Sequence, residues 1–163
     1  RLCLEITESG LVTETPAALK ALHDIAALGV RLSVDDFGTG YATLKQLQQL
    51  PVHEMKIDRS FVSGMTHNRG SESIVRATID LGRQLGLCVV AEGVESVAEM
   101  RALAALGCSE IQGYFVAKPL REATVVDWIR SRHLLYESSP SAYFEMLTAQ
   151  QGGAAGTRAA LHS

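Results

Sequence analysis

Two adjacent aspartates, Asp35 and Asp36, end an apolar run in the stretch VDDFGTGYATL at residues 34–44, directly before a loop with two glycines. Neighbouring carboxylates repel each other, and placing them where the chain enters the interior costs free energy unless a cation or a shared proton compensates. The pair therefore indicates, as a first hypothesis, a site for a metal ion.

More polar residues recur at the ends of predicted strands. Alternation predicts strands at residues 2–7, 30–36, 53–58, 87–91 and 110–115, and alternate residues of a strand share a face. One face of this set is apolar and suits packing against helices. On the other face, a polar residue lies near the carboxyl end of each strand: Glu5, Asp35, Lys56, Glu92 and Gln112.

Two interpretations of these residues stay open. A single acidic residue at a strand end often caps the next helix or lies in solvent, and this holds for Asp36 in particular. For the whole set, one shared polar site at the carboxyl ends of the strands is favoured, because charged residues are rarely buried without a partner.

A shared polar site of this kind predicts phosphodiester chemistry with magnesium or manganese. Converging carboxylates suit these oxygen-preferring ions rather than zinc, and the five histidines show no ligand spacing. Two ions bridged by one aspartate activate a water for in-line attack, and Lys56 would hold that water or neutralise phosphoryl charge. A Schiff base on Lys56 is an alternative. The neighbouring aspartates disfavour it, since anions raise the pKa of a lysine.

The loop at residues 37–40, FGTG, also has two interpretations. Its backbone N–H groups could cradle a phosphate, although the motif lacks the spacing of a nucleotide fingerprint. A mobile lid that bends after the aspartates is the favoured alternative. Glu8, just beyond the first strand, is placed to anchor it.

Helical patterns separate the predicted strands. Thr15 and Pro16 begin one helix that ends near Gly29, and others are predicted at residues 43–50, 71–84, 96–106 and 124–132. Repeated alternation of strand and helix indicates parallel β/α units, in either an open doubly wound sheet or a (β/α)8 barrel. From residue 138 on the periodicity fades, which predicts a largely disordered extension at residues 138–163, with a short helix at residues 143–147 as an option.

Composition limits the class of protein. The chain has 163 residues, of which 47% are hydrophobic and 20% charged, as in an ordinary globular domain. A net charge of -3 gives no basic face for polymeric nucleic acid. No apolar run is long enough to span a membrane, no leader opens the sequence, and three scattered cysteines suit a reducing compartment, so the cytoplasm is expected.

Five motifs together resemble those of a known family. They are LEITES at residues 4–9, DDFGTGYATL at 35–44, KIDRSFV at 56–62, VVAEGVE at 89–95 and QGYFVAKPL at 112–120. In order and spacing they resemble the EAL-domain phosphodiesterases of bacterial cyclic di-GMP signalling, over about residues 1–132. The resemblance implies a (β/α)8 TIM-type barrel that uses magnesium or manganese to hydrolyse cyclic di-GMP to linear pGpG.

The resemblance also implies residue roles. Metal ligands would be Glu5, Asp35, Asp36 and Glu92, with Asp35 bridging two ions and Glu92 also counted as catalytic. Lys56 would hold the attacking water, Gln112 would support water or ligand, and Glu8 would steady the loop after the aspartates. The helix at residues 43–50 would pair two copies as a homodimer, although its leucines could equally pack on the barrel.

The chain departs from the family pattern at two places. The usual Gly-Tyr-Ser-Ser-Leu is Gly-Tyr-Ala-Thr-Leu at residues 40–44, which touches no ligand. The Glu-x-Leu motif and the asparagine of the next strand would both precede Arg1. Residues 1–137 are therefore expected to be the part of the domain from about the fourth to the eighth strand. A sensory or cyclase domain, and any membrane anchor, would lie upstream in the parent protein.

That departure leaves two functional expectations. The parent protein would be a phosphodiesterase, whereas this chain alone would be inactive, because two ligands of one metal are missing. The alternative is a degenerate, non-catalytic EAL domain that acts as a cyclic di-GMP receptor or a protein-interaction module. The retained carboxylates and Lys56 favour catalysis.

Overall fold

The computed structural model describes residues 2–11, 15–40 and 43–138. Ser138, the first residue of the predicted extension at residues 138–163, is helical, and the rest of that extension, with the short helix considered at residues 143–147, lies outside the described residues. Five strands form the centre of the fold: β1 (Cys3–Thr7), β2 (Arg31–Phe37), β3 (Glu54–Ile57), β4 (Cys88–Ala91) and β5 (Glu110–Ile111). The helices are α1 (Glu8–Leu11), α2 (Pro16–Ala27), α3 (Leu44–Gln49), α4 (Arg59–Gly64), α5 (Arg69–Leu85), α6 (Val97–Leu106) and α7 (Glu122–Ser138).

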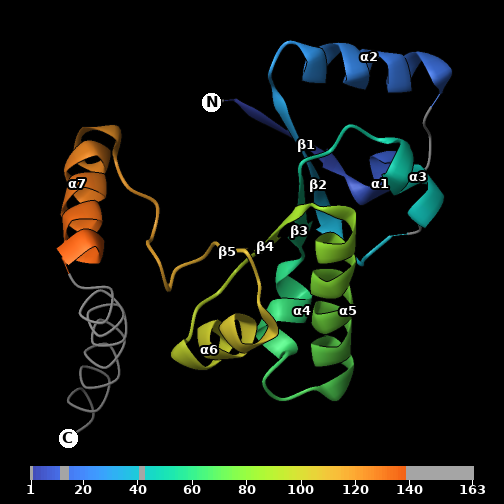
Figure 1. The fold of residues 1–163 in the computed structure, drawn as a ribbon. Helices are drawn as coiled ribbons and strands as arrows, with labels where there is room; N and C mark the ends of the chain where they lie inside the picture. Colours follow the sequence, from blue (N-terminus) through green and yellow to red (C-terminus); the bar gives the residue numbers. More distant parts are fainter. Residues whose placement is uncertain (1, 12–14, 41–42, 139–163) are drawn as a thin grey trace, which may run out of the picture.

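The strand order decides between the two predicted architectures. All strands are parallel, and they are hydrogen-bonded in the order β1-β2-β3-β4-β5. A doubly wound sheet reverses its order at a switch point, whereas a barrel adds each strand next to the previous one. The described sheet is therefore a segment of a β/α barrel (Figure 1).

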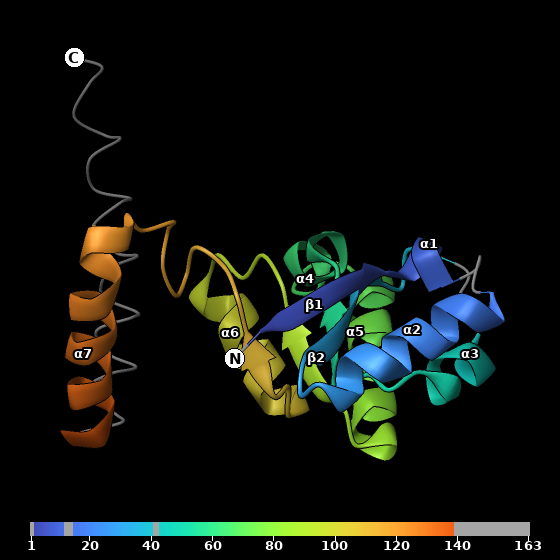
Figure 2. The same cartoon turned by 90° about the horizontal axis from the view of Figure 1, so that it is seen from above.

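The apolar face of the sheet packs against the helices, as predicted. Val34, Met55 and Val89 are buried in one core with side chains from α3 to α6, among them Leu47, Val62, Val75, Ile79 and Leu103. Gly82 of α5 allows a close approach to β4, since an added Cβ would overlap Val89. In both views α7 stands apart from the sheet (Figures 1 and 2). No helix in the described ranges is long and apolar enough to cross a bilayer.

Local signals account for the helix ends. The side chain of Thr15 caps α2, and Ser96 and Glu99 form a capping box at the start of α6. Gly86 and Gly107 end α5 and α6 in the left-handed conformation that glycine adopts without strain. α5 begins two residues before its predicted start, because Asn68 accepts hydrogen bonds from the N–H groups of the first turn.

The local structure differs from the prediction in three respects. The last strand was predicted at residues 110–115, but β5 has only two residues, because the chain beyond it pairs with the loop after β4: Val94 N–H donates to Gln112 O at 3.0 Å. The short helices α1 and α4 were not predicted. Asp58, placed at the end of a predicted strand, instead caps α4 by accepting from Ser60 N–H at 3.0 Å.

Candidate active site

Lys56 lies at the centre of the candidate site. This residue of β3 is 5% exposed. Its Nζ is 2.6 Å from Glu92 Oε1, 2.8 Å from Glu5 Oε1 and 3.5 Å from Asp35 Oδ1. The parallel pairing of β1 with β2, β2 with β3 and β3 with β4 brings together these four residues, which are far apart in the sequence.

The environment of Lys56 keeps its ammonium group protonated. Burial by itself lowers the pKa of Lys56, but hydrogen bonds to Glu5 and Glu92 and the charges of Glu92 and Asp35 outweigh burial and raise this pKa. A protonated amine is not a nucleophile, so the geometry disfavours the Schiff-base alternative.

Asp36 has an unusual backbone conformation directly after Asp35. Among the described residues it is the one non-glycine residue with positive φ, at 55°. Aspartate tolerates this region better than most residues, but the conformation costs free energy and is typical of functional sites. The pKa of Asp36 is raised, first by burial and then by the charges of Asp35 and Asp58.

Three of the predicted metal ligands lie close enough to share an ion. Asp35, Asp36 and Glu92 each offer a carboxylate oxygen, and these oxygens lie within 4.8 Å of one another. Asp35 Oδ1 is buried and has no hydrogen-bond partner among the described residues. Lys56 Nζ lies 3.5 Å from this oxygen as an ion-pair partner. A donor set made of oxygen alone, with one buried oxygen that accepts no hydrogen bond, fits a divalent cation such as magnesium or manganese.

Glu5 stands outside this trio. Its side chain is 53% exposed, and it reaches the other carboxylates through its hydrogen bond to Lys56 at 2.8 Å. The structure thus places Glu5 beside the trio rather than within it.

Glu8 holds the glycine loop. It is the first residue of α1 and is 3% exposed. Its Oε2 accepts hydrogen bonds from Gly38 N–H at 2.9 Å and Gly40 N–H at 2.8 Å. A Cβ on Gly40 would lie 3.0 Å from the Glu8 carboxyl carbon, so the loop and the glutamate are in close contact. These two N–H groups are already engaged, which disfavours the loop as a phosphate cradle.

Gln112 lines a cleft beside the trio. The cleft has a volume of about 220 Å³ and is bordered by Arg59, Glu92, Gly93, Glu95, Gln112, Gly113 and Tyr114. Arg59 is the first residue of α4, and the other residues follow β4 and β5. The cleft therefore opens at the carboxyl ends of the strands, where barrel enzymes bind their ligands.

Sequence reasoning missed three residues of this region. Asp58 raises the pKa of Asp36, and its position two residues after Lys56 was a usable signal, since both fall on one face of the strand predicted at residues 53–58. Arg59 and Glu95 form an ion pair with Nη2 and Oε1 2.7 Å apart. No signal in the sequence linked these two residues, because the pair depends on how two loops meet.

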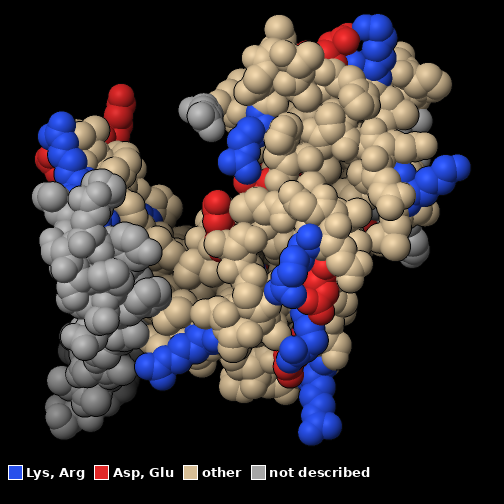
Figure 3. All heavy atoms as spheres, in the orientation of Figure 1, with Lys and Arg blue, Asp and Glu red and all other residues tan. Residues whose placement is uncertain are grey.

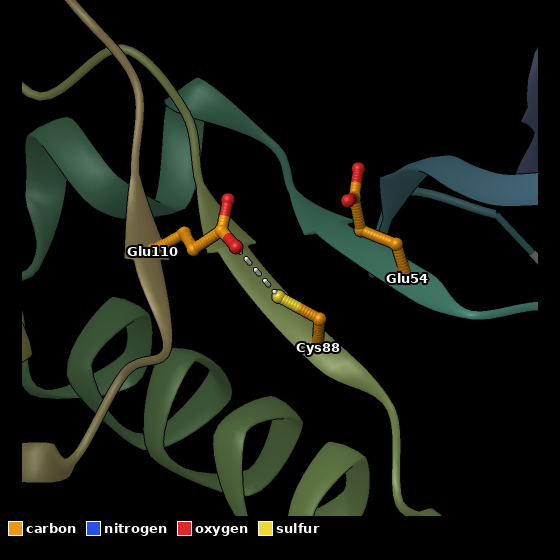
Figure 4. A group of neighbouring side chains, drawn as sticks. All are labelled: Glu54, Cys88 and Glu110. Atoms are coloured by element: carbon orange, nitrogen blue, oxygen red, sulfur yellow. Dashed lines mark hydrogen bonds between the residues drawn. The ribbon is translucent and has the colours of Figure 1, made fainter. Parts of the chain in front are cut away.

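A second acidic group lies at the amino ends of the strands. Figure 4 shows Glu54, Cys88 and Glu110 on the neighbouring strands β3, β4 and β5, with Cys88 Sγ donating to Glu110 Oε1 at 3.4 Å. Arg31 pairs with Glu54 at 3.4 Å. Burial, the hydrogen bond to Glu110 and nearby carboxylates raise the pKa of Cys88 to about 11, so its thiol stays protonated at neutral pH. A cavity of about 540 Å³ near Arg31 and Cys88 lies at this same end, away from the trio.

Charges on the surface are mixed in sign. Over α5, Figure 3 shows basic side chains beside acidic ones, and α5 carries the ion pairs Arg76–Glu72 and Arg83–Asp80. A nucleic-acid polymer requires a continuous basic face. The face of the described residues in Figure 3 does not present one.

Comparison with known proteins gives a consistent result. The EAL domain family model matches residues 1–119. The bifunctional diguanylate cyclase/cyclic di-GMP phosphodiesterase MucR from Pseudomonas aeruginosa is 44% identical over 119 residues, which are 73% of this chain. The chain spans 17% of the length of that relative.

Solved structures share the fold. The PaMucR phosphodiesterase in its c-di-GMP complex has a TM-score of 0.73 and 43% identity, over 76% of this chain and 50% of that chain. The manganese/cy-diGMP complex of Klebsiella pneumoniae BlrP1 has a TM-score of 0.64 and 31% identity, over 69% of this chain and 29% of that chain. The predicted fold class, an α/β segment of a (β/α)8 barrel, is confirmed.

Proposed function

The chain belongs to the EAL domain family, as its motifs predicted, and on that premise we propose that it acts within a metal-dependent phosphodiesterase. The substrate would be cyclic di-GMP and the product linear pGpG, in bacterial second-messenger signalling. The observation that supports this most is the convergence of Lys56 with the carboxylates of Glu5, Asp35 and Glu92.

The residues that would hold the metal are Asp35, Asp36 and Glu92, and Glu5 would complete the set. Magnesium or manganese, when bound there, would lower the pKa of a water and offset charge on the phosphodiester. Asp35 Oδ1, which is buried and accepts no hydrogen bond among the described residues, supports this assignment. The trio would also lose its mutual repulsion when a cation binds.

The remaining residues orient the reactants. Lys56, fixed by its carboxylate partners, would hold the attacking water and stabilise the charge that develops on the phosphoryl oxygens. Gln112, in the adjoining cleft, would support the water or the ligand. Glu8 would keep the loop after the aspartates in one conformation through its two backbone hydrogen bonds, so that the ligand carboxylates stay aligned.

The proposal includes assembly and location. Leu44 of α3 is 58% exposed while Leu47 is buried in the core, so this helix has both a packed side and a free apolar residue. We expect α3 to contribute to a homodimer, and the reaction to take place in the cytoplasm. Comparing the molar mass of the wild-type protein and a Leu44→Lys variant by light scattering tests the dimer.

The experiment that tests the function measures hydrolysis in the full-length protein. With manganese, we expect chromatography to show conversion of cyclic di-GMP to pGpG, and Asp35→Asn to abolish it. Asp80→Asn on α5 is the matched control, because Asp80 is exposed and pairs only locally in the structure. Binding of cyclic di-GMP without turnover in manganese would contradict the proposal and favour the non-catalytic receptor.

A further inference from the structure

Among the described residues that line the cleft beside the trio, one is a cation, and the proposed function gives it no role. Arg59 lines the cleft together with Glu92, Glu95, Gln112 and Tyr114. Its guanidinium donates to Glu95 Oε1 at 2.7 Å, and the side chains of the pair are 62% and 45% exposed. The pair is therefore accessible to a ligand in the cleft.

The position of Arg59 is set by a glycine. Gly93 has φ of +66°, and a Cβ added there would overlap the Cβ, Cγ and Cδ atoms of Arg59. The aliphatic part of the arginine therefore lies directly against the loop after β4. Held by Gly93 at its stem and by Glu95 at its head, the guanidinium is oriented before any ligand arrives, which reduces the entropy lost on binding.

The cleft is suited to part of a ligand rather than to all of it. Its volume of about 220 Å³ is below the roughly 300–1,000 Å³ of pockets that enclose a whole small molecule. Glu92 belongs to both the trio and the cleft. A phosphodiester at the trio would therefore direct the group attached to it, a ribose with its base, into the cleft.

We propose that Arg59 recognises the guanine base of the substrate by donating two hydrogen bonds to O6 and N7, with Glu95 positioning the guanidinium. The inference rests on the proposed function, since it takes cyclic di-GMP as the ligand. Arginine bound in this bidentate way is the commonest specific contact to guanine. Adenine presents a donor in place of O6, so Arg59 would discriminate against it.

Two features favour a base over a phosphate as the partner of Arg59. Its charge is already offset by Glu95, which weakens a purely electrostatic attraction but leaves directed donors free. Tyr114 lines the same cleft and is 55% exposed, and exposed aromatic rings are the common stacking surface for unpaired bases.

The test uses a ligand pair that differs by one acceptor. Cyclic di-GMP and its 7-deazaguanine analogue, which lacks N7, are titrated calorimetrically into the full-length protein with calcium, so that binding is separated from turnover. We expect the wild-type protein to bind the analogue about tenfold more weakly. In Arg59→Gln, cyclic di-GMP binding should fall about 10- to 100-fold, and the two ligands should bind equally.

Control variants separate a base contact from a change in folding. Arg76→Gln removes a similarly exposed arginine–glutamate pair on α5 and should leave both affinities unchanged. Glu95→Gln should weaken cyclic di-GMP binding less than Arg59→Gln does, because Arg59 keeps its donors. Thermal unfolding of each variant should match the wild type, since an exposed ion pair contributes little to stability.

The outcomes distinguish failure of the guanine contact from failure of the proposed function. If Arg59→Gln lowered the affinity for both ligands by the same factor, Arg59 would make a phosphate or structural contact. If it left both affinities unchanged, Arg59 would make no contact. Either result would overturn this inference and leave the proposed function standing. If the wild-type protein bound neither ligand, the proposed function would fail, and this inference would fail with it.

Discussion

Lys56 Nζ lies 2.6 Å from Glu92 Oε1, so the ammonium group of β3 is bound directly to the carboxylate that follows β4. Glu92 is also one of the three carboxylates whose oxygens lie within 4.8 Å of one another. The ion pair therefore joins the proposed metal ligands to the residue that would orient the attacking water. Changes at either residue should affect both the stability of the fold and the chemistry of the site.

Replacing Lys56 with methionine should destabilise the fold. The substitution leaves Glu5, Asp35 and Glu92 close together without their cation, and breaking a buried ion pair on one side costs about 3 kcal/mol or more. Urea unfolding measures the difference. Lys20→Met, which removes an exposed pair with Asp24, is the control and should change stability by less than about 1 kcal/mol. Equal effects of the two substitutions would contradict this account.

Manganese should stabilise the protein through the trio. An ion that binds only the folded state at a hundred times its Kd adds about 2.7 kcal/mol, which would appear as a higher Tm and be reversed by a chelator. Asp35→Asn should lose most of this increase, because it removes the carboxylate with the unsatisfied oxygen. Glu110→Gln changes the other acidic group and should keep the increase. The opposite pattern would place the ion at the amino ends of the strands.

Glu8 should affect turnover through the loop it binds. Glu8→Leu removes the acceptor of two backbone hydrogen bonds, and the resulting shift of the loop after Asp36 should lower kcat about 100-fold. Glu8→Gln retains an oxygen that can accept both bonds and should recover part of the rate. Steady-state kinetics with cyclic di-GMP measure both variants. A loss in Glu8→Gln as large as that in Glu8→Leu would show that the charge, rather than the hydrogen bonds, is required.

The thiol of Cys88 should react slowly below pH 9. Burial, the hydrogen bond to Glu110 and nearby charges raise its pKa from 9.0 to about 11, so at pH 8 its thiolate fraction should be about 100-fold below that of an unperturbed thiol. Alkylation by iodoacetamide, followed by mass spectrometry of the Cys88 peptide, measures the rate. Glu110→Gln should accelerate it, although only in part, since burial is the largest cause.

The raised pKa of Cys88 also makes the stability of the folded state depend on pH. The folded pKa of Cys88 lies above the unfolded value, so the folded state holds its proton more tightly. The contribution to stability is fully present below about pH 9 and is lost as the pH rises towards 11. Unfolding midpoints of wild type and Cys88→Ser between these pH values should converge as the pH increases, and parallel curves would be inconsistent with the raised pKa.

Patterns within a few residues determined much of the fold. Alternation located all five strands and separated their apolar face from the polar one, and Thr15, Gly86 and Gly107 marked helix ends that the structure contains. These signals are local, because a side chain's face and a cap's hydrogen bonds depend on neighbours along the chain. The same local reasoning brought the candidate site residues onto one face of the strands.

Only the tertiary structure decided which strands are neighbours and how the site is assembled. The consecutive strand order selected the barrel, and the loop at Val94 ended β5 early. The register set Lys56 between Glu5 and Glu92 and left Glu5 outside the trio. The way the segments after β3 and β4 meet joined Arg59 to Glu95. Distances between residues so far apart in sequence depend on how strands and loops pack, and no periodicity within a single segment encodes them.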